Sequence, residues 1–214
     1  FLNDPGRMVR TLATHVGTSA QIIKARAERI ERQMDGIMVT GPGLHLKARR
    51  VILAAGAHSR ALALQAGDKV PLDTERGYHV EWDMPSPRLT RPTCPTTRGF
   101  YLCPMQGRLR VAGTVELGSI HDPANPRRFD YLERHVRRVM GLKQPVARKW
   151  LGFRPSLPDS LPVIGPSPNE PRMIYAFGHQ HLGLTLAGAT GQLVADCIAG
   201  KAPTWLDSFS VQRF

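Results

Sequence analysis

Hydrophobic and polar residues along the chain follow two repeating patterns, one typical of helices and one typical of strands. Apolar residues recur at helical spacing over residues 8–16, 59–67, 126–140 and 184–199. Asn125 and Pro126 give the third stretch a helix start and Gly141 gives it an end, while Gly200 ends the fourth. Ser59 is the expected cap of the second stretch. These stretches are the predicted helices.

Strand patterns fill much of the remaining sequence. Strands are predicted over residues 20–26, 36–40, 44–47, 50–55, 78–83, 100–103, 108–116 and 173–177. Tyr78, Val80 and Trp82 alternate with polar residues, as in a strand with one buried face. One side of the strand at 108–116 is expected to carry Leu109, Val111 and Val115. Proline-rich loops are predicted at 85–95 and 155–168, so the pattern as a whole predicts a mixed α/β fold.

Composition narrows the class of protein. The chain has 214 residues, of which 42% are hydrophobic, and is long enough to bury a sizeable core. No run of eighteen apolar residues predicts a membrane span, and no signal peptide is visible. The three cysteines, Cys94, Cys103 and Cys197, form no Cys-x-x-Cys pair. They therefore argue against a disulfide framework or a zinc site and fit a reducing compartment.

A formal net charge of +12 raises the possibility of nucleic-acid binding. Arginines are spread along the chain, and their densest block lies on the predicted helix at 126–140. Phe129, Leu132, Val136, Val139 and Met140 form the apolar face of that helix, so the arginines form its solvated side. No aromatic residues are interleaved with the arginines on that solvated side, as a base-stacking surface requires, so we expect no nucleic-acid partner.

The most informative segment is near the C-terminus. Arg154 stands in a Gly-Phe-Arg-Pro run, and the glycine-rich turn of residues 178–183 opens the last predicted helix. One face of that helix consists of small residues, which permits close approach to its backbone. A helix N-terminus binds negative charge, such as that of a reduced flavin. From these residues alone, the alternative is a helix packed on a sheet, with Gly178 and Gly183 serving only as turn residues.

Five motifs in a fixed order extend this observation over nearly the whole chain. They are residues 51–59 (Val-Ile-Leu-Ala-Ala-Gly-Ala-His-Ser), 77–79 (Gly-Tyr-His), 113–116 (Gly-Thr-Val-Glu), 152–155 (Gly-Phe-Arg-Pro) and 178–185. With these motifs the chain resembles the FAD-dependent D-amino-acid oxidase (DAO) family, most closely its bacterial D-amino acid dehydrogenase branch. The family's Gly-x-Gly-x-x-Gly dinucleotide fingerprint is absent from these residues. We therefore expect the C-terminal half of a flavoprotein that begins inside its substrate domain.

The resemblance implies a fold in two regions interleaved in sequence. Residues 1–18 and 72–149 would form an antiparallel-sheet substrate domain. Residues 19–66 and 151–199 would form the remainder of a Rossmann-like, glutathione-reductase-type FAD-binding domain, followed by a tail at 200–214. The N-terminal nucleotide-binding segment of that domain would be missing.

The resemblance also implies roles for substrate-binding residues. Arg154 matches the family arginine that binds the substrate carboxylate, where a bidentate fork fixes orientation; the alternative is a structural pair with Asp159. Tyr101 matches a tyrosine whose hydroxyl touches the same carboxylate, and its alternative is a sheet tyrosine with its tip in water. His181 would face the substrate amino group. His179 is expected to fix the turn by hydrogen bonding, and Tyr78 to be a core residue.

Further positions match the family's FAD contacts. The flavin ring would be held by Gln180, His181, Leu182, Gly183, Leu184 and Thr185. Ala55 and Gly56 would approach the pyrophosphate, and Ala27 the adenine through its main chain. Ala55 replaces the family threonine and His58 the family tryptophan, which weakens a hydroxyl contact but leaves a backbone contact.

The resulting expectation is an enzyme that uses FAD to oxidise the Cα–N bond of a D-amino acid or a cyclic imino acid such as D-proline. Oxidation of glycine or sarcosine is a variant of the same chemistry. The alternative is a flavoprotein half that acts as a non-catalytic binding module or is completed by another subunit. Oxygen and a quinone both remain open as electron acceptors. The expected location is the cytoplasm, with a peripheral contact at the inner membrane as the alternative.

Overall fold

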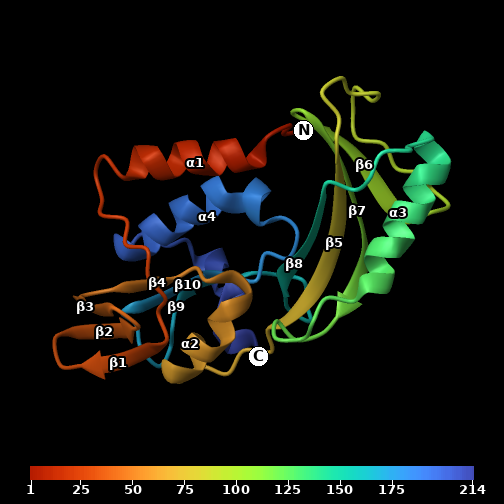
Figure 1. Cartoon of the computed structure of the whole chain (residues 1–214). Helices are drawn as coiled ribbons and strands as arrows, with labels where there is room; N and C mark the ends of the chain where they lie inside the picture. Colours follow the sequence, from red (N-terminus) through yellow and green to blue (C-terminus); the bar gives the residue numbers. More distant parts are fainter. The chain divides into compact units, whose positions relative to one another are not determined.

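The computed structural model describes residues 1–214, and these form two compact units (Figure 1). Unit 1 comprises residues 1–23, 76–116 and 121–152, and unit 2 comprises residues 24–75, 117–120 and 153–214. Each unit has its own hydrophobic core. The mixed α/β class expected from the sequence is confirmed.

Unit 1 is built on a four-stranded sheet in the order β6-β7-β5-β8. The strands are β5 (Asp73–Asp83), β6 (Phe100–Met105), β7 (Arg108–Leu117) and β8 (Arg148–Ser156), and the helices are α1 (Pro5–Val16) and α3 (Pro126–Met140). Helix α3 covers one face of this sheet, as Figure 1 shows. Its apolar residues Phe129, Leu132 and Val136 are buried against Tyr78 and Trp82, which leaves the other sheet face free of α3.

Local signals in unit 1 predicted its elements well. Helix α3 has the predicted Asn125 cap, which accepts a hydrogen bond from the Arg127 amide, and the predicted left-handed Gly141 at its end. The β6–β7 hairpin and the buried face of β5 are also confirmed. Val115 was expected to be inside but is 50% exposed, because Thr114 has a positive φ of 59° that interrupts the alternation. Val139, predicted on the apolar face of α3, is also exposed.

Unit 2 contains two three-stranded sheets. One has the order β1-β2-β3, formed by β1 (Arg29–Gln33), β2 (Gly36–Gly41) and β3 (Leu44–Ala48), all antiparallel. The other has the order β4-β10-β9, formed by β4 (Val51–Leu53), β9 (Val163–Pro166) and β10 (Met173–Phe177). Strands β4 and β10 are parallel, and β9 is antiparallel to β10. The helices are α2 (Ser59–Gln65) and α4 (Gly183–Ile198), followed by short 3-10 turns at Thr204–Phe209 and Val211–Arg213.

Several expectations for unit 2 are wrong. The expected strand at 20–26 is absent, since residues 20–26 belong to no strand and Ile22 and Ile23 are exposed. The strand expected at 50–55 is only Val51–Leu53. Ser59 is the first residue of α2, after a 3-10 turn at Gly56–His58, and does not cap it. The loop expected at 155–168 contains the end of β8 and all of β9.

A buried polar network joins the turn after α2 to β10. Asp68 is 4% exposed, and its carboxylate accepts hydrogen bonds from the Tyr175 hydroxyl (2.6 Å), the Asn169 amide (2.7 Å) and the Ser167 hydroxyl. Because a buried carboxylate needs such partners, this network fixes the route of the chain beneath the β4-β10-β9 sheet.

Candidate functional site

The candidate site lies at the carboxyl ends of the parallel strands of the β4-β10-β9 sheet. Strands β4 and β10 run parallel, with Leu53 opposite Tyr175, so their carboxyl ends lie at the same end of the sheet. The chain then enters the Gly56 turn after β4 and the glycine turn at 178–182 after β10. Ligands of open α/β sheets bind at this carboxyl edge. The structure therefore brings together two segments that the sequence separates by more than a hundred residues.

The glycine turn has a strained and crowded backbone. Gly178 has a φ of +88°, and a Cβ there would lie 2.5 Å from Leu157 Cδ1, so only glycine fits. Gln180 has a φ of +51°, which is uncommon for a residue with a side chain. Its amide donates to the Pro155 carbonyl at 3.0 Å. This bond ties the turn to the Gly-Phe-Arg-Pro segment and places it beside the residue that follows Arg154.

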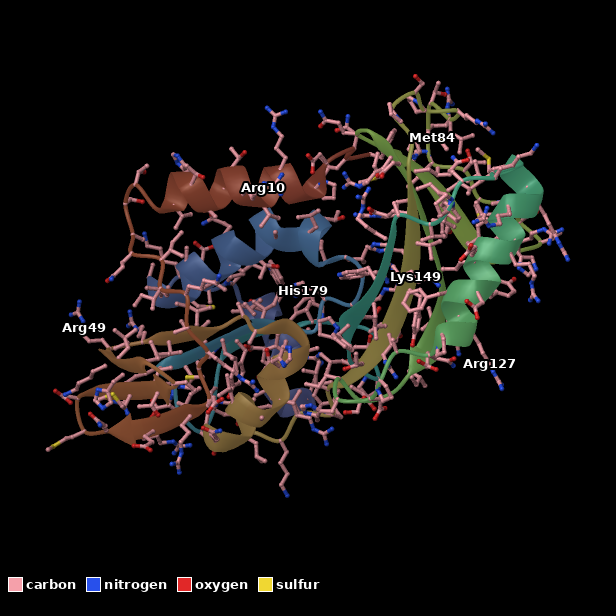
Figure 2. All side chains as sticks on the ribbon, in the orientation of Figure 1. Arg10, Arg49, Met84, Arg127, Lys149 and His179 are labelled. Atoms are coloured by element: carbon pink, nitrogen blue, oxygen red, sulfur yellow. The ribbon has the colours of Figure 1, made fainter.

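His179 holds the turn against α4. Its Nε2 lies 2.9 Å from the Thr190 hydroxyl, and burial lowers the pKa of the ring. Figure 2 shows His179 beneath α4, at the end of the chain segment that leaves β10. The prediction that His179 fixes the turn by hydrogen bonding is confirmed.

The start of α4 presents unpaired backbone donors. The first bond of the helix is from the Leu186 amide to the Leu182 carbonyl, at 2.9 Å. The amides of Gly183, Leu184 and Thr185 precede it, and neither a capping side chain nor an acidic residue stands in this first turn. Further along the helix, a Cβ built at Gly188 or Gly191 meets nothing within 4 Å. Uncapped amides and an open backbone face fit an anionic, planar group such as a flavin.

Arg154 is half-buried near the end of β8. The alternative role, pairing with Asp159, is wrong, because Asp159 Oδ2 accepts from Arg213 Nε at 2.6 Å. No ion pair of Arg154 is found among the residues of unit 2. The glycine at position 152 of the same motif has a local explanation, since a Cβ there would lie 1.9 Å from the Trp150 ring.

The remaining predicted site residues are placed as follows. His181 is exposed in the turn, and Leu182 and Leu184 are 45% and 43% exposed. Ala27 lies in the exposed, irregular segment that precedes β1. Ala55 and Gly56 follow β4, and Gly56 has a φ of +56° with open space where a Cβ would be. All of these residues belong to unit 2, together with Arg154.

The two tyrosines singled out from the sequence belong to unit 1. Tyr101 pairs with Ala112 across the β6–β7 hairpin and is 57% exposed. Tyr78 is 1% exposed, donates its hydroxyl to Glu116 at 2.6 Å and accepts from the Asn125 amide at 3.1 Å. Burial raises its pKa, and the prediction that Tyr78 is a core residue is confirmed.

Sequence reasoning missed a charged cluster on the sheet face of unit 1 that α3 does not cover. Glu81 is 4% exposed and is bound by Arg110 Nε at 2.9 Å, Arg148 Nε at 3.0 Å and Arg108 Nε at 3.2 Å. Burial acts to raise the pKa of Glu81, but the hydrogen bonds from Arg110 and Arg148 outweigh it and lower the pKa. The signal in the sequence was the period-two spacing of polar residues along β5 and β7.

His79 adds a neutral ring to this cluster. It stacks on Trp150 with 4.7 Å between ring centroids. Burial and the positive charges of Arg110 and Arg108 lower the pKa of His79 to about 4. The imidazole is therefore uncharged near neutral pH.

Comparison with known proteins identifies the family. Residues 1–197 match the family model described as FAD dependent oxidoreductase, named DAO. The chain belongs to this DAO family. It is 34% identical over 220 residues to a D-amino-acid oxidase of Bradyrhizobium diazoefficiens, covering 99% of this chain and 52% of the relative. The chain thus spans about half the length of that DAO relative.

Solved structures give the same fold. Glycine oxidase from Geobacillus kaustophilus is similar with a TM-score of 0.79 and 25% identity, over 89% of this chain and 52% of that one. L-proline dehydrogenase from P. horikoshii has a TM-score of 0.84 over 99% of this chain and 60% of that one. At 20% identity, this similarity indicates a shared fold and no more.

Other classes of site find no support among residues 1–214. No group of three or more His, Cys, Asp and Glu side chains converges as metal ligands would. All three cysteines are free. No helix has the length and apolar character needed to cross a bilayer.

Proposed function

We propose that this chain carries part of the active site of an FAD-dependent enzyme that oxidises the Cα–N bond of a D-amino acid or of a cyclic imino acid such as D-proline. Glycine and sarcosine are variant substrates of the same chemistry. Membership of the DAO family and 34% identity to a D-amino-acid oxidase support the proposal. The observation that carries it is the bond between the Gln180 amide and the Pro155 carbonyl.

That bond links the segment that would bind the substrate to the segment that would hold the flavin. The guanidinium of Arg154 would bind the substrate carboxylate in a bidentate fork, which fixes the direction of the α-carbon hydrogen. Gln180, His181, Leu182, Gly183, Leu184 and Thr185 would hold the flavin ring. Because Arg154 adjoins Pro155, any shift of one segment would move the other, and the substrate would keep its orientation relative to the flavin.

The other predicted contacts complete the cofactor site. The open backbone at Ala55 and Gly56 would approach the pyrophosphate, and Ala27 the adenine. When bound, FAD supplies the acceptor at N5 for the hydride that leaves the α-carbon. A substrate amine that arrives uncharged needs no protein base. His179, with its lowered pKa and its bond to Thr190, would serve to hold the turn.

The test is anaerobic reduction of the whole, FAD-loaded protein by single amino acids. D-alanine, D-proline, glycine and L-alanine are mixed with it separately, and loss of the flavin's visible absorbance is followed. We expect rapid bleaching with at least one of the first three and little with L-alanine. Admitting oxygen then tests the acceptor, because an oxidase releases hydrogen peroxide. Failure of all four to bleach the flavin would refute the proposal.

A further inference from the structure

Unit 2 has a hollow beside α2 that shares no residue with the candidate functional site. Its volume is about 540 Å³, which is within the range of small-molecule sites. Helix α2, the segment that follows it and the C-terminal residue form its walls, and Figure 1 shows the C-terminus near α2. The lining residues are Arg60, Leu64, Lys69, Val70, Pro71 and Phe214, all of which belong to unit 2.

Part of this lining is apolar and open to solvent. Leu64 is 56% exposed on α2, and Phe214 is 46% exposed. Val70 is 4% exposed and belongs to the core of unit 2, so the hollow reaches down to that core. An apolar chain that lay against Leu64 and Phe214 would remove apolar surface of both from water, which favours binding.

Two cations line the same hollow without a partner. Arg60 lies one helical turn before Leu64 on the same face of α2, and Lys69 follows the helix. Both side chains are exposed, and neither forms an ion pair or a hydrogen bond. No acidic side chain is among the lining residues. The hollow therefore offers partners to an anionic group and none to an ammonium group.

Both walls are anchored in the folded chain. The carboxylate of Asp68, the residue before Lys69, accepts a hydrogen bond from the Tyr175 hydroxyl at 2.6 Å. At the C-terminus, the Phe214 amide donates to the carbonyl of Val211, a buried member of the core. The backbone of the hollow is thus set before a ligand binds, which lowers the entropy cost of binding.

We propose that this hollow binds a medium-chain monocarboxylate, with its carboxylate at Arg60 and Lys69 and its chain against Leu64 and Phe214. The guanidinium of Arg60 presents a fork of N–H groups that matches two carboxylate oxygens, and the Lys69 ammonium adds a further donor. An amphiphile of the same length with an ammonium head would be repelled by both cations. This site goes beyond the proposed function, because none of the residues expected to bind FAD or the amino acid lines it.

The test is isothermal titration calorimetry of the whole, FAD-loaded protein with octanoate, butyrate and octylammonium. Octanoate should bind at least about tenfold more tightly than butyrate, since each buried methylene adds about two- to fourfold in affinity. Octylammonium should not bind. Arg60→Gln and Lys69→Gln should each weaken octanoate binding about five- to tenfold, as expected of a charge-assisted hydrogen bond at a partly exposed site. Leu64→Ser should reduce the advantage of octanoate over butyrate.

Arg49→Gln and Lys201→Gln are the matched controls, because both residues are exposed in unit 2 and the variants lose the same charges. Both should bind octanoate as the wild type does. The inference is overturned if octanoate does not bind, if octylammonium binds equally well, or if the controls weaken binding as much as Arg60→Gln and Lys69→Gln. Weaker binding in Arg154→Met, with none in Arg60→Gln, would place octanoate at the proposed substrate site and also overturn it.

Discussion

Replacing His79 with phenylalanine should remove the part of the loss of folding stability at acidic pH that arises from protonation of this histidine. In the folded chain His79 is stacked on Trp150 and its side chain is 13% exposed. Burial and the charges of Arg110 and Arg108 lower its pKa from 6.5 to about 4. The phenylalanine ring would keep the stack on Trp150 but cannot take up a proton.

The sign follows from which state binds the proton first. As the pH falls below 6.5, His79 becomes protonated in the unfolded chain but stays neutral in the folded chain down to about 4. The stability contributed by the neutral folded histidine is therefore complete above pH 6.5 and is lost as the pH falls. Each pH unit in this window costs about 1.4 kcal/mol, so the loss reaches about 2 kcal/mol at about pH 5.

Urea unfolding at about pH 7.5 and about pH 5 measures this loss, since both pH values lie above the folded pKa. The wild type should lose about 2 kcal/mol more between the two pH values than His79→Phe does. His79→Gln, which abolishes both stacking and titration, should match His79→Phe in pH dependence while being less stable throughout. If His79→Phe loses as much stability as the wild type, the pKa of His79 is not lowered in the folded chain, and the ring in the Glu81 cluster is not held neutral.

Three further outcomes are expected. The 214-residue chain should bind FAD more weakly than micromolar, because it has no Gly-x-Gly-x-x-Gly loop, and fluorescence quenching with a submicromolar dissociation constant would contradict this. Gly183→Val should lower the flavin content of the whole protein with little change in Tm, because Gly183 has no positive φ and a Cβ there meets only His179 Cβ, at 3.5 Å; a full complement of FAD would show that this turn is not the flavin site. Tyr175→Phe should lower the free energy of unfolding by about 1.5–3 kcal/mol, since the Tyr175 hydroxyl donates to the buried carboxylate of Asp68. Tyr131→Phe should lower it by only about 0.5–1.5 kcal/mol, because the Tyr131 hydroxyl donates to a neutral carbonyl. Equal losses of the two variants in urea unfolding would show that the Asp68 carboxylate does not add to stability in this way.

Elements with local signals were predictable from the sequence. Helix α3 is bounded by the Asn125 cap, Pro126 and Gly141, and each of these residues acts within a few positions of itself. The hairpins formed by β2 with β3 and by β6 with β7 likewise depend on short turns and alternating side chains. Such signals need no knowledge of distant residues.

Features that depend on distant partners were not predictable. Residues 20–26 have strand-like composition, but a strand also needs a neighbour to pair with, and none is found there. Arg213 competes for Asp159 from 54 positions away and so leaves Arg154 without that partner. The convergence of Arg148 and Arg110 on Glu81 also depends on sheet order, which periodicity does not reveal.

The site shows the same division. The glycine turn and the Gly-Phe-Arg-Pro run were visible as motifs in the sequence. Their connection through the Gln180 amide and the Pro155 carbonyl was not, because it depends on a left-handed Gln180 that no propensity indicates.

The most direct test of the central claim is the kinetic effect of Arg154→Met in the whole, FAD-loaded protein. If Arg154 binds the substrate carboxylate, kcat/KM for D-alanine should fall at least about tenfold, with KM raised and kcat lowered. D-alaninamide, which lacks the carboxylate charge, should be affected far less, and Arg134→Met, an exposed control on α3, should affect neither. Unchanged kinetics with D-alanine, or equal losses for D-alanine and D-alaninamide, would contradict the assignment and leave Arg154 with a structural role only.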